Sequence, residues 1–424
     1  MGVIAELLKS TPLPKMVKIK EKFDDTCIPV DQIHDTVFEQ LGQKKLEGMI
    51  KPGMRIAITV GSRGISNIPL IVRSIADFVK SQGGQPFVVP AMGSHGGATA
   101  EGQRAVIEGY GVTEEAIGCP ILSSMETVEI GHTEEGQPVR MDKNAYEADG
   151  IIVCGRIKPH TGFRGPYESG LMKMMAIGLG KQAGAEIIHQ DGFGHFKKNI
   201  PMFGTVILRN SKVICGLALV ENAYDHTREI VGLTPDEIIT EEPVILQRAK
   251  SYMPRILFDS CDVLIVDEIG KNISGDGMDP NISGRFPTPY ATGGIDAQRV
   301  VVLDLTKESH GNACGIGLAD VTCMRLFEKF DKEATYPNAI TNTVTGELKI
   351  PMIMYNDKQA IQLGIKSCNE IDRAHPRVIR IKNTMQIETI EISEGMLEEA
   401  AQNPDIEILT QPEEMHFNEQ DNLW

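Results

Sequence analysis

The chain has 424 residues, of which 41% are hydrophobic and 24% are charged, and its formal net charge is −16. This composition indicates a soluble globular protein of two or three domains. The negative charge argues against nucleic acid and anionic membranes as partners, because both require a basic face. We find no run of about 18 apolar residues that would predict a membrane span, and no apolar core of a secretion signal. The eight cysteines include no CxxC pair, which favours a reducing, cytoplasmic location.

Strand-like and helix-like segments alternate along the chain. In the first half, apolar runs predict strands at residues 55–60, 86–92, 150–157 and 213–220. Helical spacing of apolar residues predicts helices at residues 67–81 and 101–110. After a charged helix at 241–252 that Pro254 ends, further strands are predicted at 263–269, 299–305 and 378–382. We therefore predict an α/β fold of two Rossmann-like domains, residues 1–250 and 251–424, with mainly parallel sheets and an interdomain cleft. The acidic segment 394–424 is compatible with either a packed or a frayed tail.

Three of the predicted strands run into loops that carry polar residues. The first is followed by Gly61-Ser62-Arg63-Gly64, the second by Gly93-Ser94-His95-Gly96-Gly97 and the third by Lys158-Pro159-His160. A single histidine at a strand end is more often a hydrogen-bonding loop residue than a catalyst. In open parallel sheets, however, ligands bind beyond the carboxyl ends of the strands. The sequence therefore predicts that Arg63, His95 and His160 converge on one edge of the sheet.

A lysine and a histidine follow in the next segment. Lys173 lies within the apolar run 171–175, where an ammonium group is costly unless it is paired or uncharged. It is therefore a candidate nucleophile, and His189 is a candidate proton carrier or metal ligand. Their separation of 189 − 173 = 16 residues would place them about 160° apart on one unbroken helix. Both can serve one site only if the helix is interrupted, and Gly178-Leu179-Gly180 is the predicted break. The alternatives are a lysine that extends to solvent and a hydrogen-bonded histidine at a helix end.

In their order and spacing, these residues resemble the motifs of the lactate racemase (LarA-like) family of nickel-pincer-dependent 2-hydroxyacid racemases and epimerases. The resemblance is firmest over residues 55–190. It implies a nickel-pincer nucleotide cofactor, in which nickel is bound to a dithio derivative of nicotinic acid mononucleotide. Lys173 would hold this cofactor covalently, His189 would be a nickel ligand, and Gly93 and Ser94 would contact the cofactor.

The resemblance also implies a reaction. The protein would be an isomerase that inverts C2 of a 2-hydroxy acid by hydride transfer to and from the cofactor. His95 and His160 would act as acid and base on opposite faces of the substrate, and Arg63 would hold the substrate carboxylate. Enzymes of cofactor biosynthesis are implied as partners, and the sequence is compatible with a homo-oligomer.

Two departures from the family motifs favour a substrate other than lactate. Val60 stands where the racemase type has an aspartate. Asp279-Pro280-Asn281 keeps the Asp-x-Asn of a second-domain motif, but the tyrosine, glutamine and lysine that follow in the racemase type are absent. Arg285 is the nearest cation, so we predict that it takes over contacts with anionic groups of the substrate.

Two other interpretations remain open. The first is a hydrolase or lyase that uses a divalent metal such as zinc, held by His95, His160 and His189. The second is a non-catalytic homologue that binds hydroxy acids without the cofactor.

Overall fold

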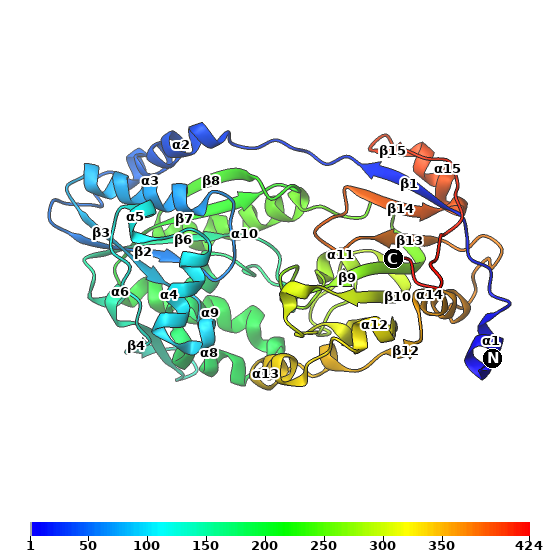
Figure 1. The fold of residues 1–424 in the computed structure, drawn as a ribbon. Coiled ribbons are helices and arrows are strands. Elements are labelled where there is room, and N and C mark those ends of the chain that lie inside the picture. The colour runs from blue at the N-terminus through cyan, green and yellow to red at the C-terminus, as the bar shows by residue number, and fades with distance from the viewer. Residues whose placement is uncertain (1) are drawn as a thin grey trace. The chain divides into compact units, whose positions relative to one another are not determined.

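The computed structural model describes residues 2–424 and divides the chain into two compact units, each built around its own sheet (Figure 1). One unit spans residues 24–253, and the other combines residues 2–23 with residues 254–424. The predicted α/β class with parallel strand pairing is confirmed. Among residues 2–424 we find no helix with the length and hydropathy that a membrane span needs.

The first 23 residues do not belong to the first domain, where we had predicted them. Strand β1 (Met16–Glu21) pairs antiparallel with β14 (Thr389–Ser393) and β15 (Ile406–Ile408) in the sheet of the other unit. Val17 and Ile19 of this strand are fully buried there. The burial of these apolar side chains and the two rows of backbone hydrogen bonds therefore tie the N-terminus to the C-terminal half. The second boundary lies between Met253 and Pro254.

The unit of residues 24–253 contains a five-stranded sheet in the order β3-β2-β6-β7-β8. The first four strands of this order are parallel, and β8 is antiparallel to β7. The strands are β2 (Arg55–Val60), β3 (Gln85–Pro90), β6 (Gly150–Arg156), β7 (Val213–Glu221) and β8 (Thr227–Leu233). Their nearly continuous apolar sequences follow from burial on both faces, which parallel sheets require.

Helices cover both faces of this sheet. Ile56 and Ile58 of β2 pack with α2 and α3 on one face, whereas Ala57 faces a cluster that includes α9 and α10. The longer helices are α2 (Ile33–Leu41), α3 (Ile68–Ser81), α4 (Ala100–Gly109), α8 (Lys181–Gln190), α9 (Phe196–Asn210) and α10 (Pro235–Tyr252). The shorter ones are α5 (Glu114–Ile117), α6 (Lys143–Glu147) and α7 (Leu171–Lys173). A hairpin of β4 (Thr127–His132) and β5 (Pro138–Asp142) was not predicted from the sequence.

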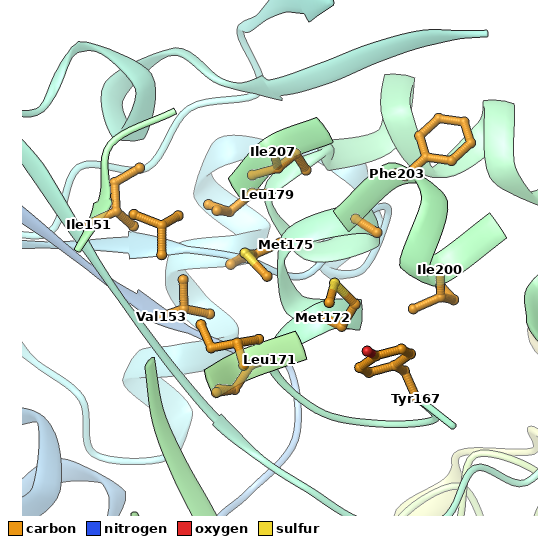
Figure 2. Packing of buried hydrophobic residues seen from close by; sticks show 14 of the residues in the cluster. Ile151, Val153, Tyr167, Leu171, Met172, Met175, Leu179, Ile200, Phe203 and Ile207 are labelled. Atoms are coloured by element: carbon orange, nitrogen blue, oxygen red, sulfur yellow. The ribbon is translucent and has the colours of Figure 1, made fainter. Parts of the chain in front are cut away.

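The segment from Leu171 to Gln190 is interrupted, as the glycines at 178 and 180 predict. Helix α7 is followed by a π-helical segment, η4 (Met174–Leu179), and α8 then begins at Lys181, whose φ of 53° is left-handed. Leu171, Met175 and Leu179 lie between β6 and helix α9 (Figure 2). The apolar side of the interrupted helix is therefore part of the core, and π-helical turns of this kind are frequent at functional sites.

The other unit has an eight-stranded sheet in the order β12-β11-β10-β9-β13-β14-β1-β15. Its parallel strands are β9 (Ser260–Ile269), β10 (Asp296–Leu305), β11 (Val321–Cys323), β12 (Met352–Met354) and β13 (Val378–Ile381). Its helices are α1 (Val3–Leu8), α11 (Pro280–Ser283), α12 (Met324–Phe327), α13 (Lys332–Asn342), α14 (Asp357–Lys366) and α15 (Leu397–Gln402). The C-terminal tail is packed, because the Leu423 N–H donates to Asp357 at 2.8 Å and the Arg325 guanidinium stacks on Trp424 at 4.0 Å.

A buried carboxyl group supports the start of the interrupted helix. Glu242 of α10 is 1% exposed and accepts a hydrogen bond from the Met172 N–H at 2.9 Å. The first N–H groups of any helix lack partners within that helix, so this contact satisfies a donor of α7. A side chain at Gly170 would collide with the other oxygen of Glu242. Burial raises the pKa of Glu242 to about 8, so the carboxyl group is mostly protonated at neutral pH.

We predict that Glu242→Gln changes how stability depends on pH. The folded pKa lies above the ordinary value of 4.5, so the folded protein binds more protons between pH 4.5 and about 8. Wild-type stability should therefore fall as pH rises through this window. Glutamine keeps an acceptor for Met172 and has no proton to lose, so the variant should lose this part of the slope. Above pH 8 it should be more stable than wild type by about 2–4 kcal/mol.

Urea unfolding of both proteins at pH 5 and pH 8.5 measures this difference. Burial also raises the pKa values of Glu21 and Glu347. Both residues are present in both proteins, so their contributions to the pH dependence of stability cancel in the comparison. Equal slopes for the two proteins would contradict a neutral, buried Glu242.

Candidate active site

The three predicted strand-end loops lie together at the carboxyl-terminal end of the parallel strands of the five-stranded sheet, and we call this end the rim. Strands β3, β2 and β6 are adjacent and parallel, so the loops that follow them are neighbours at their carboxyl ends. These loops carry His95, Arg63 and His160, respectively. The structure therefore brings the three residues to one edge, as the sequence predicts.

Ser62 links the loops of Arg63 and His95. The Nδ1 atom of His95 makes a short hydrogen bond with the Ser62 hydroxyl, and the Tyr110 hydroxyl donates to the Ser62 carbonyl at 3.1 Å. His95 and Arg63 are both exposed. Within residues 2–424, no carboxylate lies within ion-pair distance of Arg63. The guanidinium group is therefore available to an anionic ligand.

Gly93 and Ser94 hold the His95 loop against the interrupted helix. Gly93 has a φ of 61°, and its N–H donates to the carbonyl of Gly178 in η4 at 3.2 Å. Any β-carbon at Gly93 would lie 3.1 Å from the Ile177 side chain, so glycine is required for both its conformation and its space. The Ser94 carbonyl accepts the Ala98 N–H at 3.1 Å and closes the turn. These contacts are structural, and the contact of both residues with a cofactor stays a prediction.

His160 is held by a buried carboxylate that the sequence analysis did not identify. Glu168 is 1% exposed, and its carboxylate accepts a hydrogen bond from the backbone N–H of His160 at 2.8 Å. The same carboxylate forms an ion pair with Lys250 at 2.7 Å. The Nδ1 atom of His160 accepts the Gly162 N–H at 2.9 Å, so in the neutral ring the proton resides on Nε2. Burial, followed by the charge of Lys173, lowers the pKa of His160 well below its ordinary value. The ring is therefore neutral near pH 7.

Lys173, His160 and His189 lie close together. Burial and then the charge of Lys173 lower the pKa of His189 to about 4, and the same charge acts on His160. The ring of Phe193 lies 6.1 Å from that of His160 and 5.9 Å from that of His189, measured between ring centroids. Lys173 is partly exposed. The interruption at η4 therefore allows one segment of chain to present both Lys173 and His189, as predicted.

The structure does not add Arg285 to this group. Arg285 lies in the other unit, where its guanidinium pairs with Asp320 at 2.8 Å and donates to the carbonyls of Ala297 and Gln298 at 3.1 Å. These contacts stabilise the start of β10, and a role in substrate binding stays a prediction. Among residues 2–424, no three His, Cys, Asp or Glu side chains are grouped so that they could hold a metal ion.

Three buried charged residues that support the site were missed in the sequence: Glu168, Lys181 and Glu242. A signal existed for Glu242, because it continues the buried helical spacing of Ile238, Ile245 and Leu246 in α10. A carboxylate at such a position is costly unless it is paired or protonated. Lys181 directly follows Gly180, and no spacing rule connects it with its distant partners.

Comparisons with known proteins identify the N-terminal half. Residues 8–198 match the family model described as the lactate racemase N-terminal domain. The comparison with curated proteins gave no match. The lactate racemase apoprotein from Thermoanaerobacterium thermosaccharolyticum is similar at 14% identity over 68% of this chain and 74% of that chain, with a TM-score of 0.42. A Thermotoga maritima protein, whose structure was solved by a structural genomics consortium, is similar at 12% identity over 66% of this chain and 72% of that chain, with a TM-score of 0.47.

Both structural similarities are weak, so the assignment depends on the family model and on the residues that lie within it. The matched region contains the rim loops together with Lys173 and His189. Residues 8–198 therefore resemble the N-terminal domain of the lactate racemase (LarA-like) family.

Proposed function

We propose that the protein is a racemase or epimerase that inverts C2 of a 2-hydroxy acid other than lactate, with a nickel-pincer nucleotide attached to Lys173. One observation carries this proposal: Lys173, His160 and His189 share one environment, in which Lys173 lowers the pKa of both histidines and Phe193 lies near both rings. This arrangement occurs within the matched family domain.

The side chains present fit the proposed cofactor. A metal ligand must be a neutral imidazole, and a pKa of about 4 keeps His189 neutral at physiological pH. Imidazole nitrogen suits nickel. Lys173 is partly exposed, and its primary amine is the group that covalent attachment needs. Lys173 and His189 would therefore hold the cofactor, which when bound supplies a hydride acceptor for the substrate carbon.

The chain's own residues would bind the substrate and move its proton. The exposed Arg63 would hold the carboxylate through two parallel hydrogen bonds. His160, with its proton on Nε2, is a hydrogen-bond donor to the C2 oxygen in this conformation. His95 is exposed and its Nδ1 is bonded to Ser62, which suits the exchange of the hydroxyl proton.

The alternative functions have weaker support. A zinc hydrolase would need His95, His160 and His189 around one ion, and no such group of three is found within residues 2–424. A non-catalytic homologue is distinguished by the second experiment below.

We predict that co-production with the cofactor biosynthesis enzymes adds a covalent mass to the chain at Lys173. Peptide mapping should find the modification on Lys173 and not on Lys181, because the Lys181 side chain is fully buried. Nickel should approach about one ion per chain. Lys173→Arg keeps the charge but should lose the adduct, and the exposed Lys44→Ala should keep it. An unmodified Lys173 in wild-type protein from these cells would contradict the proposed attachment.

We predict that His95→Ala and His160→Ala each slow interconversion of 2-hydroxy acid enantiomers by about 10²–10⁴-fold, the usual contribution of a positioned acid or base. Both variants should still load the cofactor, whereas His189→Ala should lose nickel. Chiral chromatography of a panel of 2-hydroxy acids measures the rates. His132→Ala, a change of an exposed histidine in β4, should keep the wild-type rate. Loaded wild-type protein that binds these acids but interconverts none would instead support a non-catalytic homologue.

A further inference from the structure

Lys181 is a fully buried lysine to which the proposed function gives no role. Its side chain has 0% exposure, although it stands at the start of α8 in the middle of the site segment. Its φ of 53° is left-handed, a conformation that residues with a β-carbon rarely adopt. Strain of this kind persists only where the surrounding structure over-determines it, and it is common at functional sites.

The ammonium group of Lys181 has two hydrogen-bond acceptors and one buried carboxylate beside it. Its Nζ atom donates to the Pro90 carbonyl, lies 3.0 Å from Oε1 of Gln103 and forms an ion pair with Asp142 at 3.2 Å. These partners belong to the end of β3, to α4 and to the end of β5. The Asp142 side chain is also fully buried. A buried charge is costly without its partner, so the ion pair ties α8 to the end of β5, and the two hydrogen bonds tie it to β3 and α4.

Gln103 connects Lys181 to the loop that carries His95 by hydrogen bonds. Because its Oε1 accepts from Lys181, its amide nitrogen is directed the other way, where it donates to the Gly93 carbonyl at 2.8 Å and the His95 carbonyl at 3.3 Å. Gln103 is itself 0% exposed. Lys181 also holds Pro90, at the end of the strand that leads into this loop. The His95 loop is therefore fixed at its start and along its length by one ammonium group.

We infer that Lys181 is a positioning residue: together with Asp142 and Gln103, it fixes the segment 93–98 that presents His95 relative to α8, the helix that presents His189. The catalytic consequence of this inference rests on the proposed function, whereas the structural part does not. Because its side chain has no exposed surface, the ammonium group would act through the backbone of the loop and not by contact with a ligand.

The test separates positioning from stability. Lys181→Met leaves Asp142 buried without a partner and should destabilise the whole unit. In the double variant Lys181→Met/Asp142→Asn no unpaired charge remains, and the asparagine can still accept the Ala145 N–H that Asp142 caps at 2.9 Å. We expect the double variant to recover most of the lost melting temperature. The Lys181–Gln103–loop connection stays broken in both variants.

Amide hydrogen exchange of the protein without cofactor, followed by mass spectrometry, measures the local stability of residues 93–98 directly. The amides of Gly93, His95 and Ala98 are hydrogen-bonded in the structure. In the double variant they should exchange about tenfold faster or more, while the amides of β6 keep the wild-type rate. Gln103→Leu, which keeps the ion pair and removes both donors to the loop, should give the same selective increase. Ile75→Ala in the core of α3 is the control, because it should lower stability without selective exchange at residues 93–98.

The loaded enzyme gives the second readout. If His95 acts in the chemical step, both Gln103→Leu and the double variant should lower kcat about tenfold or more while KM changes little. Wild-type exchange at residues 93–98 in both variants would overturn the inference. A loosened loop with unchanged kcat would overturn its catalytic part. Absence of turnover in loaded wild-type protein would instead contradict the proposed function, and the exchange result would still decide whether Lys181 positions the loop.

Discussion

The interruption between α7 and α8 is the constraint on which the site depends. One segment of 20 residues must present Lys173 and His189 to the same place, and an unbroken helix would direct them about 160° apart. The π-helical turn and the left-handed Lys181 remove this conflict. A left-handed residue with a β-carbon costs about 1–2 kcal/mol. Burial of Met175 or Leu179 alone contributes about 1.5–3 kcal/mol, so packing against β6 and α9 is sufficient to hold the unusual backbone.

Buried ionisable groups stabilise the remaining parts of the site in two ways. Glu168 and Lys181 each form an ion pair within the core, and each fixes the loop of a candidate catalytic histidine. Within residues 2–424 no cation offsets the burial of Glu242, so its pKa is raised and it supports α7 as a neutral acid. Apolar side chains could fill the same space, but they could not satisfy the backbone donors and acceptors of these short segments. The loops that carry the site therefore depend on polar groups within the core.

The sequence predicts the local features of this protein well and the long-range ones poorly. The strand at 55–60 and the helix break at 178–180 follow from apolar runs and glycines, and the structure has both. The pairing of β1 with β14 was missed because it joins Met16 to Ser393, and an amphipathic strand does not specify its partner. The sequence places Lys173 within an apolar run, but it does not show which of the neighbouring side chains face the core. Met172 and Met175 are fully buried there.

The site is electropositive although the protein carries a net charge of −16. Burial is the largest cause of the lowered pKa of His160, and the nearby charges of Lys173, Lys158 and Arg164 add to it. Charges are screened beyond about 8 Å at physiological ionic strength, so distant surface carboxylates contribute little at the rim. Partly buried cations near His160 are screened less and therefore dominate there. A carboxylate substrate would thus experience attraction at the rim, and the same cations, together with burial, keep the imidazole of His160 neutral and able to donate its proton.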